Sequence, residues 1–276
     1  MNLDILRADF IESGEDIPLS PHESSGSDNI YLSDLGRCPR QVMLRVTRAK
    51  QRPLTPSEVR MFWVGNQLHE LTQKALLWAG LMMEYERPCD CPEGLSGRFD
   101  SLWLDDGVLT LTDHKTVRSN QFKYGEFLYD PPQPKPYHLP QIGGYILWGP
   151  EAESYDFDYM DRDGSHKSIR AKVDTRTAAG RAEEEAGKLL RLWNVKEIPG
   201  PLPVEFKPHF NRSKTVLTWI GMKRPWKCDS IYCRFSGVSC TPNGEDEVRV
   251  WDNDKGYVNG GSKYAADIDR TLEEAA

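Results

Sequence analysis

The chain lacks any long run of apolar residues. Its longest uncharged apolar stretch, from Ala75 to Met83, covers nine residues, whereas a membrane-spanning helix needs about 20. The first thirty residues also lack the basic and apolar segments of a secretory signal. We therefore expect an intracellular protein with no membrane partner. It would lie in the cytoplasm, or in the host cytoplasm if the protein is viral.

Cysteine is scarce, with six among 276 residues. Small domains built on disulfides are much richer in cysteine, so this class is excluded. In an intracellular chain, cysteines are more typical of metal ligands or free thiols than of disulfides. The six are Cys38, Cys89, Cys91, Cys228, Cys233 and Cys240.

The apolar content is nevertheless sufficient for a folded core. Hydrophobic residues make up 38% of the chain and aromatic residues 10%, which excludes a disordered or fibrous protein. The length predicts one large domain or two small ones.

The net charge of −7 is unevenly distributed along the chain. Residues 1–30 carry a charge of −6 and residues 241–276 a charge of −5, which leaves +4 for residues 31–240. Two segments, 31–60 and 206–234, hold seven bases each against two acids and one acid. Such segments can follow a phosphate backbone on an otherwise acidic protein. They are equally compatible with two solvated surfaces.

Local signals predict an α/β or α+β fold with a central sheet. The clearest are Thr55-Pro56-Ser57-Glu58, which is typical of a helix start, and Asp106-Gly107, which is typical of a two-residue hairpin. We expect a loose acidic arm over 1–30, a main domain over 31–240 and an acidic tail over 241–276. The expected helices are 33–46, 55–78, 139–148 and 175–195, and the expected strands are 81–87, 97–104, 108–115, 153–160 and 166–173.

The hairpin predicts a specific pair of carboxylates. With a two-residue turn at Asp106-Gly107, Asp100 lies opposite Asp113, and opposed Cβ atoms are about 4.5–5.5 Å apart. Side-chain alternation puts Lys115 on the same face as Asp113. Two acids this close repel each other unless a cation lies between them, which favours a metal site. The alternative is a slipped register that leaves one acid in solvent.

Two helical spacings add candidates. His69 follows Gly65 by one turn, so both lie on one helix face, and Gly65 allows the sheet or a substrate backbone to approach closely. Gln141 and Tyr145 are also one turn apart. Each feature alone is common in helices with no functional role.

In order, these pieces resemble the motifs of the RecB-like branch of the PD-(D/E)XK nuclease superfamily. The matching segments are Gly65-Asn-Gln-Leu-His69-Glu70, Gly97-Arg-Phe-Asp100, Asp113-His-Lys115 and Gln141-Ile-Gly-Gly-Tyr145. The resemblance implies that His69, Asp100, Asp113 and the backbone carbonyl of His114 bind Mg²⁺ or Mn²⁺. It also implies that Lys115 acts on the attacking water and on the phosphate charge, and that Gln141 and Tyr145 contact DNA.

The segment Tyr31-Leu-Ser-Asp-Leu-Gly-Arg-Cys38-Pro-Arg40 resembles the opening helix of the CRISPR-associated and phage iron–sulfur exonucleases. That resemblance implies a 4Fe–4S cluster on Cys38, Cys228, Cys233 and Cys240. The cluster would form a subdomain that joins the two ends of the main domain and brings their basic segments, including Arg37 and Arg40, to DNA. The C-x4-C-x6-C spacing departs from the family pattern, so zinc on the same thiols and free buried cysteines remain alternatives. Cys89 and Cys91 are expected to be non-ligands.

Together these features predict a metal-dependent exonuclease that hydrolyses DNA, with single-stranded ends as substrate and 5′ to 3′ polarity implied by the resemblance. Such an enzyme would serve recombination, repair or phage replication, with proteins of those pathways as further partners. One alternative is prespacer trimming beside the proteins of CRISPR adaptation. Others are an inactive DNA-binding scaffold and, more weakly, a redox or zinc-binding protein.

Overall fold

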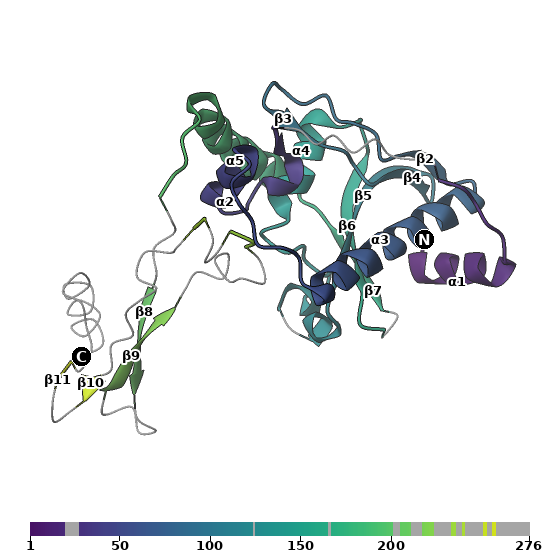
Figure 1. Cartoon of the computed structure of the whole chain (residues 1–276). Helices are drawn as coiled ribbons and strands as arrows, with labels where there is room; N and C mark the ends of the chain where they lie inside the picture. The colour runs from purple at the N-terminus through teal and green to yellow at the C-terminus, as the bar shows by residue number, and fades with distance from the viewer. Residues whose placement is uncertain are drawn as a thin grey trace. The chain divides into compact units, whose positions relative to one another are not determined.

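The computed structural model describes residues 1–19, 28–123, 125–164, 167–200, 205–210, 217–223, 233–235, 239–240, 251–252 and 256–257. The chain forms two compact units (Figure 1). The first combines Met1–Arg37 with Leu54–Glu197, and the second combines Cys38–Pro53 with Ile198–Ala276. In the part of the chain that the structure describes, no helix is both long and apolar enough to span a membrane.

A five-stranded sheet forms the centre of the first unit, in the order β2-β4-β5-β6-β7. Its strands are β2 (Met82–Tyr85), β4 (Ser101–Asp105), β5 (Val108–Val117), β6 (Ser154–Asp161) and β7 (Ser168–Lys172). Only β5 and β6 pair in parallel, and the other neighbours are antiparallel. The predicted mixed sheet with flanking helices is therefore confirmed as an α+β fold.

The hairpin between β4 and β5 has the predicted register. Asp106 and Gly107 have φ values of 52° and 83°, as a tight hairpin turn with two left-handed residues requires. Asp105 pairs with Val108, and the ladder continues to Ser101 and Thr112. The slipped register is thereby excluded. Beyond Thr112, the pairing of β5 among the described residues is with β6.

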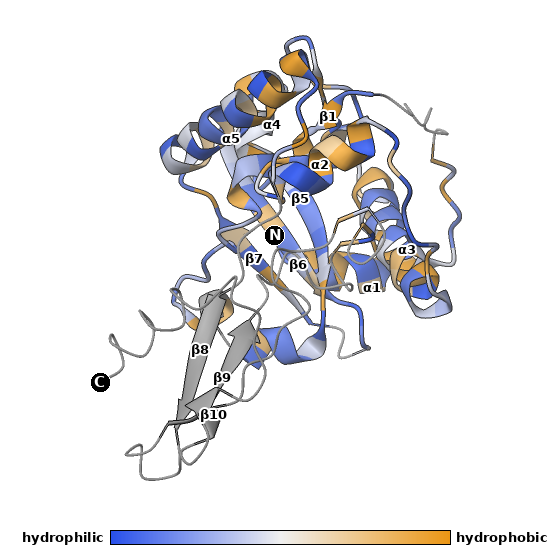
Figure 2. Ribbon diagram, turned by 60° about the vertical axis from the view of Figure 1, so that its left-hand side comes forward, coloured by the Kyte–Doolittle hydropathy of each residue, from blue (hydrophilic) through white to orange (hydrophobic). Residues whose placement is uncertain are grey.

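Helices cover both faces of the sheet, as Figure 2 shows. Helices α1 (Leu3–Ser13) and α3 (Pro56–Trp78) lie on one side, and α4 (Leu139–Trp148) and α5 (Thr175–Val195) on the other. The helix predicted to follow Thr55 is confirmed, and Thr55 and Glu58 form its capping box. Helices α4 and α5 have the predicted bounds, and α5 is capped by Asp174.

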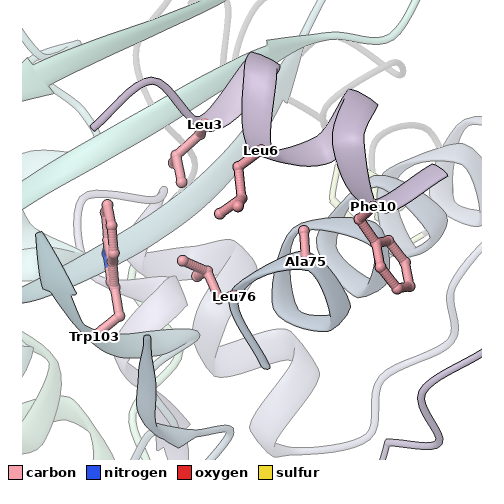
Figure 3. Packing of buried hydrophobic residues seen from close by; sticks show 6 residues of the cluster. All are labelled: Leu3, Leu6, Phe10, Ala75, Leu76 and Trp103. Atoms are coloured by element: carbon pink, nitrogen blue, oxygen red, sulfur yellow. The ribbon is translucent and has the colours of Figure 1, made fainter. Parts of the chain in front are cut away.

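The acidic segment 1–30 was predicted to be a loose arm, but its first part forms a packed helix. Helix α1 is capped by Asn2, and its buried Leu3, Leu6 and Phe10 pack with Ala75, Leu76 and Trp103 (Figure 3). An apolar stripe at spacings of three and four residues explains this packing. The high acid content of residues 1–30 obscured that stripe in the sequence.

The predicted helix over 33–46 is also wrong, because the chain breaks inside it. A 3-10 turn, η1 (Leu32–Asp34), is followed by Gly36 in a left-handed conformation, with φ +80°. Helix α2 begins only at Pro39 and ends at Val46. Proline suits the first helical position, and it disfavours a helical residue before it, so α2 cannot extend back through Cys38.

The remaining elements of the first unit are short. They are β1 (Ile30–Tyr31), which pairs in parallel with β3 (Leu95–Ser96), and the 3-10 turns η2 (Ser119–Lys123) and η3 (Gly125–Leu128). The proline-rich segment from Pro131 is a loop, as predicted, until α4 begins at Leu139.

The second unit contains α2 and two described hairpins. Strand β8 (Glu205–Phe210) pairs with β9 (Leu217–Lys223), and β10 (Trp251–Asp252) pairs with β11 (Gly256–Tyr257). Its described core contains Leu44, Cys233, Phe235 and Cys240.

Candidate active site

The candidate site is built around the middle of β5. Asp113 is fully buried, and its Oδ2 lies 2.6 Å from Nζ of Lys115, two residues further along the strand. Alternation along the strand puts both side chains on one face, as predicted. This is the face that α4 covers, because Gln141 of α4 reaches both residues.

Gln141 forms hydrogen bonds with both Lys115 and Asp113. Its Oε1 accepts a hydrogen bond of 2.9 Å from Lys115 Nζ, and its Nε2 donates one of 3.0 Å to Asp113 Oδ1. The same amide nitrogen donates to the hydroxyl of Tyr145 at 2.6 Å. The helical spacing of Gln141 and Tyr145 therefore brings both side chains into the site.

Asp100 lies at the point where the β4–β5 ladder would continue opposite Asp113. The backbone N–H of His114 donates to Asp100 Oδ2 at 2.7 Å, which fixes that carboxylate beside β5. From α3, His69 Nδ1 lies 3.8 Å from the same oxygen. Gly65 brings α3 close to β5, since a Cβ there would lie 3.4 Å from Thr116 Oγ1. The structure thus brings together the six side chains that the motifs nominated, and the backbone of His114 lies beside Asp100. The six are His69, Asp100, Asp113, Lys115, Gln141 and Tyr145.

The charges of the site follow from burial. Burial lowers the pKa of His69 to about 3, with help from His114 and Lys115, so the imidazole is neutral at physiological pH. Burial raises the pKa of Asp113, an effect that Lys115 opposes and Asp100 reinforces. Burial, together with the charges of Asp113 and Asp100, raises the pKa of Tyr145 well above its usual value. Tyr145 is therefore a neutral hydroxyl.

A buried polar chain lies behind the site, on the opposite face of β5. His114 contacts Ser101 Oγ through Nε2 at 3.0 Å and Asp158 Oδ2 through Nδ1 at 3.1 Å. Asp158 is ion-paired with Arg7 of α1, and Arg7 Nε donates to Thr72 Oγ1 at 2.8 Å. The motifs gave no hint of these partners. The available signal was the alternation of acids in the predicted strand 153–160.

One further carboxyl group lies next to Asp100. Glu86 has a left-handed φ of 50°, and its backbone N–H donates to the Asp100 carbonyl at 3.3 Å. Gln73 Nε2 donates to Glu86 Oε1 and to the same carbonyl, at 3.3 and 3.1 Å. Burial and the charge of Asp100 raise the pKa of Glu86 to about 7. Sequence reasoning did not identify Glu86 or Gln73.

The donor atoms suit a hard divalent cation. Asp100 and Asp113 offer carboxylate oxygens, the ligands that suit Mg²⁺ and Mn²⁺, and His69 adds a neutral nitrogen beside them. Asp113 Oδ2 is buried, and its ion pair of 2.6 Å with Lys115 Nζ is the contact it makes among the described residues. A buried carboxylate is stabilised by positive charge, which Lys115 supplies here and which a bound cation would increase.

The spacing of two candidate ligands also fits one ion. Atoms that each lie about 2.1 Å from a cation are at most about 4.2 Å apart, and His69 Nδ1 and Asp100 Oδ2 are 3.8 Å apart. Among the described residues, no three His, Cys, Asp or Glu side chains already form a metal-binding group. Metal binding by this site therefore stays a prediction that its chemistry supports.

The cysteines predicted to hold a cluster lie in the second unit. Cys38, Cys233 and Cys240 are buried, and Cys228 lies outside the described residues. Among the described residues, the cysteines too form no group of three that could hold a metal ion. Binding of an iron–sulfur cluster or of zinc by these cysteines therefore stays a prediction.

Four further residues were considered in the sequence analysis, namely Cys89, Cys91, Arg37 and Arg40. Cys89 and Cys91 are partly buried, and their thiols hydrogen-bond to each other. Arg37 is exposed in the first unit. Arg40 is in the second, where its Nη1 donates to the Pro199 carbonyl at 2.6 Å. Contact of either arginine with DNA stays a prediction.

No family profile and no curated protein matches the chain. Among solved structures, it is similar to SSO0001, with 22% identity, 67% of this chain and 85% of that chain covered, and a TM-score of 0.37. An alkaline exonuclease from Laribacter hongkongensis, LHK-Exo, is 15% identical, with 63% and 91% covered and a TM-score of 0.45. LHK-Exo in complex with dAMP gives 14% identity, 61% and 89% coverage and a TM-score of 0.44. Similarities of this size carry no argument about activity.

Proposed function

We propose that this protein is a metal-dependent DNA exonuclease of the RecB-like PD-(D/E)XK type, acting on single-stranded ends. The observation that carries the proposal is the contact set of Asp113, Lys115 and Gln141, with Asp100 and His69 beside it. Polarity from 5′ to 3′, and a role in recombination, repair or phage replication, are part of the proposal through the motif resemblance alone.

His69, Asp100 and Asp113 would hold Mg²⁺ or Mn²⁺, together with the carbonyl of His114. When bound, such an ion lowers the pKa of a water molecule and neutralises charge on a phosphate oxygen. The protein's own contribution is to fix the ligands. Asp100 is held by the His114 N–H, and Asp113 is held by Gln141.

Lys115 supplies a positive charge for the phosphoryl group. Within the described part of the chain, its contacts with Asp113 and Gln141 use two of its three N–H bonds. The third is available to donate to a phosphate oxygen as negative charge develops there. A cation that is already positioned needs little reorganisation during the reaction, which is the source of its catalytic effect.

An inactive DNA-binding scaffold is the less favoured reading. A scaffold has no need for a fully buried Asp113 carboxylate, because burying a charged group costs free energy even when it is paired. Prespacer trimming would use the same site and chemistry, and association with an integrase would distinguish it.

The proposal is tested by Mn²⁺-dependent digestion of end-labelled DNA. The native protein is compared with Asp113→Asn and Lys115→Ala, and with Asp16→Asn and Lys74→Ala as controls. Asp16 and Lys74 form an exposed ion pair at 3.2 Å on the same unit. We expect each site variant to lose activity by about 100-fold or more, and each control to keep it.

Substrate form separates the finer parts of the proposal. Digestion of linear but not circular single-stranded DNA is expected for an exonuclease, and labels at either end report polarity. A native protein inactive with both Mg²⁺ and Mn²⁺, or a fully active Asp113→Asn variant, would refute the nuclease assignment.

A further inference from the structure

The first half of α3 exposes large apolar side chains. Val59 and Phe62 are each 52% exposed and Trp63 is 61% exposed, and the first buried residue of the helix is Thr72. This half of the helix therefore does little to hold the core of its own unit. Exposed aromatic residues grouped in this way are typical of a binding surface.

Helical geometry separates these side chains into two stripes. Val59, Phe62, Asn66 and His69 follow one another at spacings of three and four residues, so they share one face of α3. Seven residues separate Phe62 from His69, which places Phe62 within about 20° of the direction of His69 and about 10.5 Å along the axis. The second stripe runs through Trp63, Gln67 and Glu70.

Only the first stripe is continuous with the candidate active site. It ends on His69, whose Nδ1 lies 3.8 Å from Asp100, and none of its four side chains carries a negative charge. The second stripe ends on the exposed acid Glu70, which hydrogen-bonds to Gln67 at 3.5 Å. Trp63 points about 120° away from His69 around the helix. A negatively charged strand would therefore meet no acidic side chain along the first stripe, whereas it would meet Glu70 on the second.

We propose that the stripe Val59–Phe62–Asn66–His69 guides single-stranded DNA to the site and that Phe62 stacks on one of its bases. The proposal rests on the nuclease function proposed above. An axial separation of about 10.5 Å equals about three nucleotides at the 3.4 Å spacing of a stacked strand. Phe62 thus contacts the base about three nucleotides from the scissile bond, and the amide of Asn66 lies between that base and the metal-binding residues.

The test uses single-stranded oligonucleotides that carry the fluorescent base 2-aminopurine at one position each. Binding is measured in the Asp113→Asn background, in which hydrolysis is blocked, with Phe62→Ala, Phe62→Trp or Trp63→Ala added. All three substitutions replace exposed side chains, and thermal unfolding checks that each variant folds. The same three substitutions in the native background report KM and kcat.

We expect quenching at a position about three nucleotides from the cleaved bond. Phe62→Ala should abolish this quenching and raise KM for single-stranded DNA about fivefold or more. Phe62→Trp should retain both properties because it keeps an aromatic ring. Trp63→Ala, one residue away and on the other stripe, should behave like the parent protein.

Several results would overturn the proposal. One is a Phe62→Ala variant whose KM and quenching match those of the parent. A second is an equal effect of Trp63→Ala, which would make the surface nonspecific. A third is a change in oligomeric state on Phe62→Ala without any change in DNA binding, which would make this face a contact between copies of the chain. Failure of the nuclease assignment is distinct, because it appears as inactivity of the native protein itself.

Discussion

Arg7 on α1 forms a buried ion pair with Asp158 on β6, 151 positions away in the sequence. The side chain of Arg7 is 8% exposed and that of Asp158 is fully buried. Burial alone would raise the pKa of Asp158, but Arg7 and His114 outweigh it, so the pKa lies below its usual value. Asp158 is therefore ionised in the folded protein, and Arg7 and His114 stabilise its buried carboxylate.

The first prediction concerns this pair. Replacing Arg7 with Met should lower the free energy of unfolding by about 3–5 kcal/mol, because it leaves a buried carboxylate without its cation. Urea unfolding at neutral pH measures the change. Arg87→Met is the control, since Arg87 is 64% exposed in its ion pair with Glu84, and exposed pairs contribute about 0–1 kcal/mol. Equal effects of the two substitutions would contradict the prediction.

The second prediction concerns the contact between α4 and α5. A Cβ on Gly143 would lie 2.0 Å from the carbonyl oxygen of Ala178, so Gly143→Ala forces the two helices apart. Overpacking of this kind typically costs about 1–3 kcal/mol. Gly180→Ala on α5 is the matched control. A Cβ there meets nothing within 4 Å, and alanine is favoured over glycine in a helix by about 1 kcal/mol.

Thermal unfolding of the two variants distinguishes the effects. Gly143→Ala should unfold at a lower temperature than the native protein and Gly180→Ala at a higher one. If both variants unfolded at a higher temperature than the native protein, helix propensity rather than the close approach of α4 and α5 would be the controlling factor.

The parts of the fold predicted correctly depend on local signals. The Asp106-Gly107 turn fixed the register of β4 and β5, and the capping residues of α3 marked where that helix begins. From that register alone, Asp100 was expected opposite Asp113, and the contact of Asp100 with the His114 N–H agrees. Local chemistry was sufficient here because each decision involved residues only a few positions apart.

The parts predicted wrongly, or not at all, depend on tertiary contacts. Helix α1 is stabilised by packing against Leu76 and Trp103, and its short apolar stripe does not by itself identify these distant partners. The role of Arg7 requires knowledge that α1 covers the face of the sheet bearing Asp158. The break before α2 reflects Gly36, whose Cβ would lie 3.0 Å from the carbonyl of Tyr137, a residue distant in sequence.

The third prediction concerns pH and the start of α5. Asp174 accepts hydrogen bonds from Thr177, including one of 2.7 Å from its backbone N–H, and these bonds lower the pKa of Asp174. Because the folded pKa lies below the unfolded value of about 3.9, the cap stabilises the protein fully above that value. The stabilisation is lost as the pH falls through the folded pKa.

Unfolding of the native protein and Asp174→Ala at several pH values checks this sign. The difference in stability should be constant near neutral pH and should shrink as the solution is made more acidic. Asp174→Asn, which caps without ionising, should keep its stability relative to Asp174→Ala at acid pH. A difference that grows with acidity would contradict the assignment.

The last prediction concerns Gln141, which bridges Lys115, Asp113 and Tyr145. Gln141→Leu removes both the acceptor for Lys115 and the donor to Asp113, while a side chain of similar size remains. We expect kcat on single-stranded DNA to fall about tenfold or more, because the side chains of Asp113 and Lys115 are no longer held in position. Tyr145→Phe should have a smaller effect, since it removes only the hydroxyl that accepts from Gln141.

The comparison of Gln141→Leu with Gln141→Glu separates positioning from charge. Glutamate keeps an acceptor for Lys115 but places a second negative charge beside Asp113 and removes the amide donor. If the bridge acts by positioning both groups, both variants lose kcat, and Gln141→Glu also requires a different Mn²⁺ concentration for half-maximal activity. Full activity in Gln141→Leu would mean that Asp113 and Lys115 are held without the bridge, and that the contacts of Gln141 are incidental to the reaction.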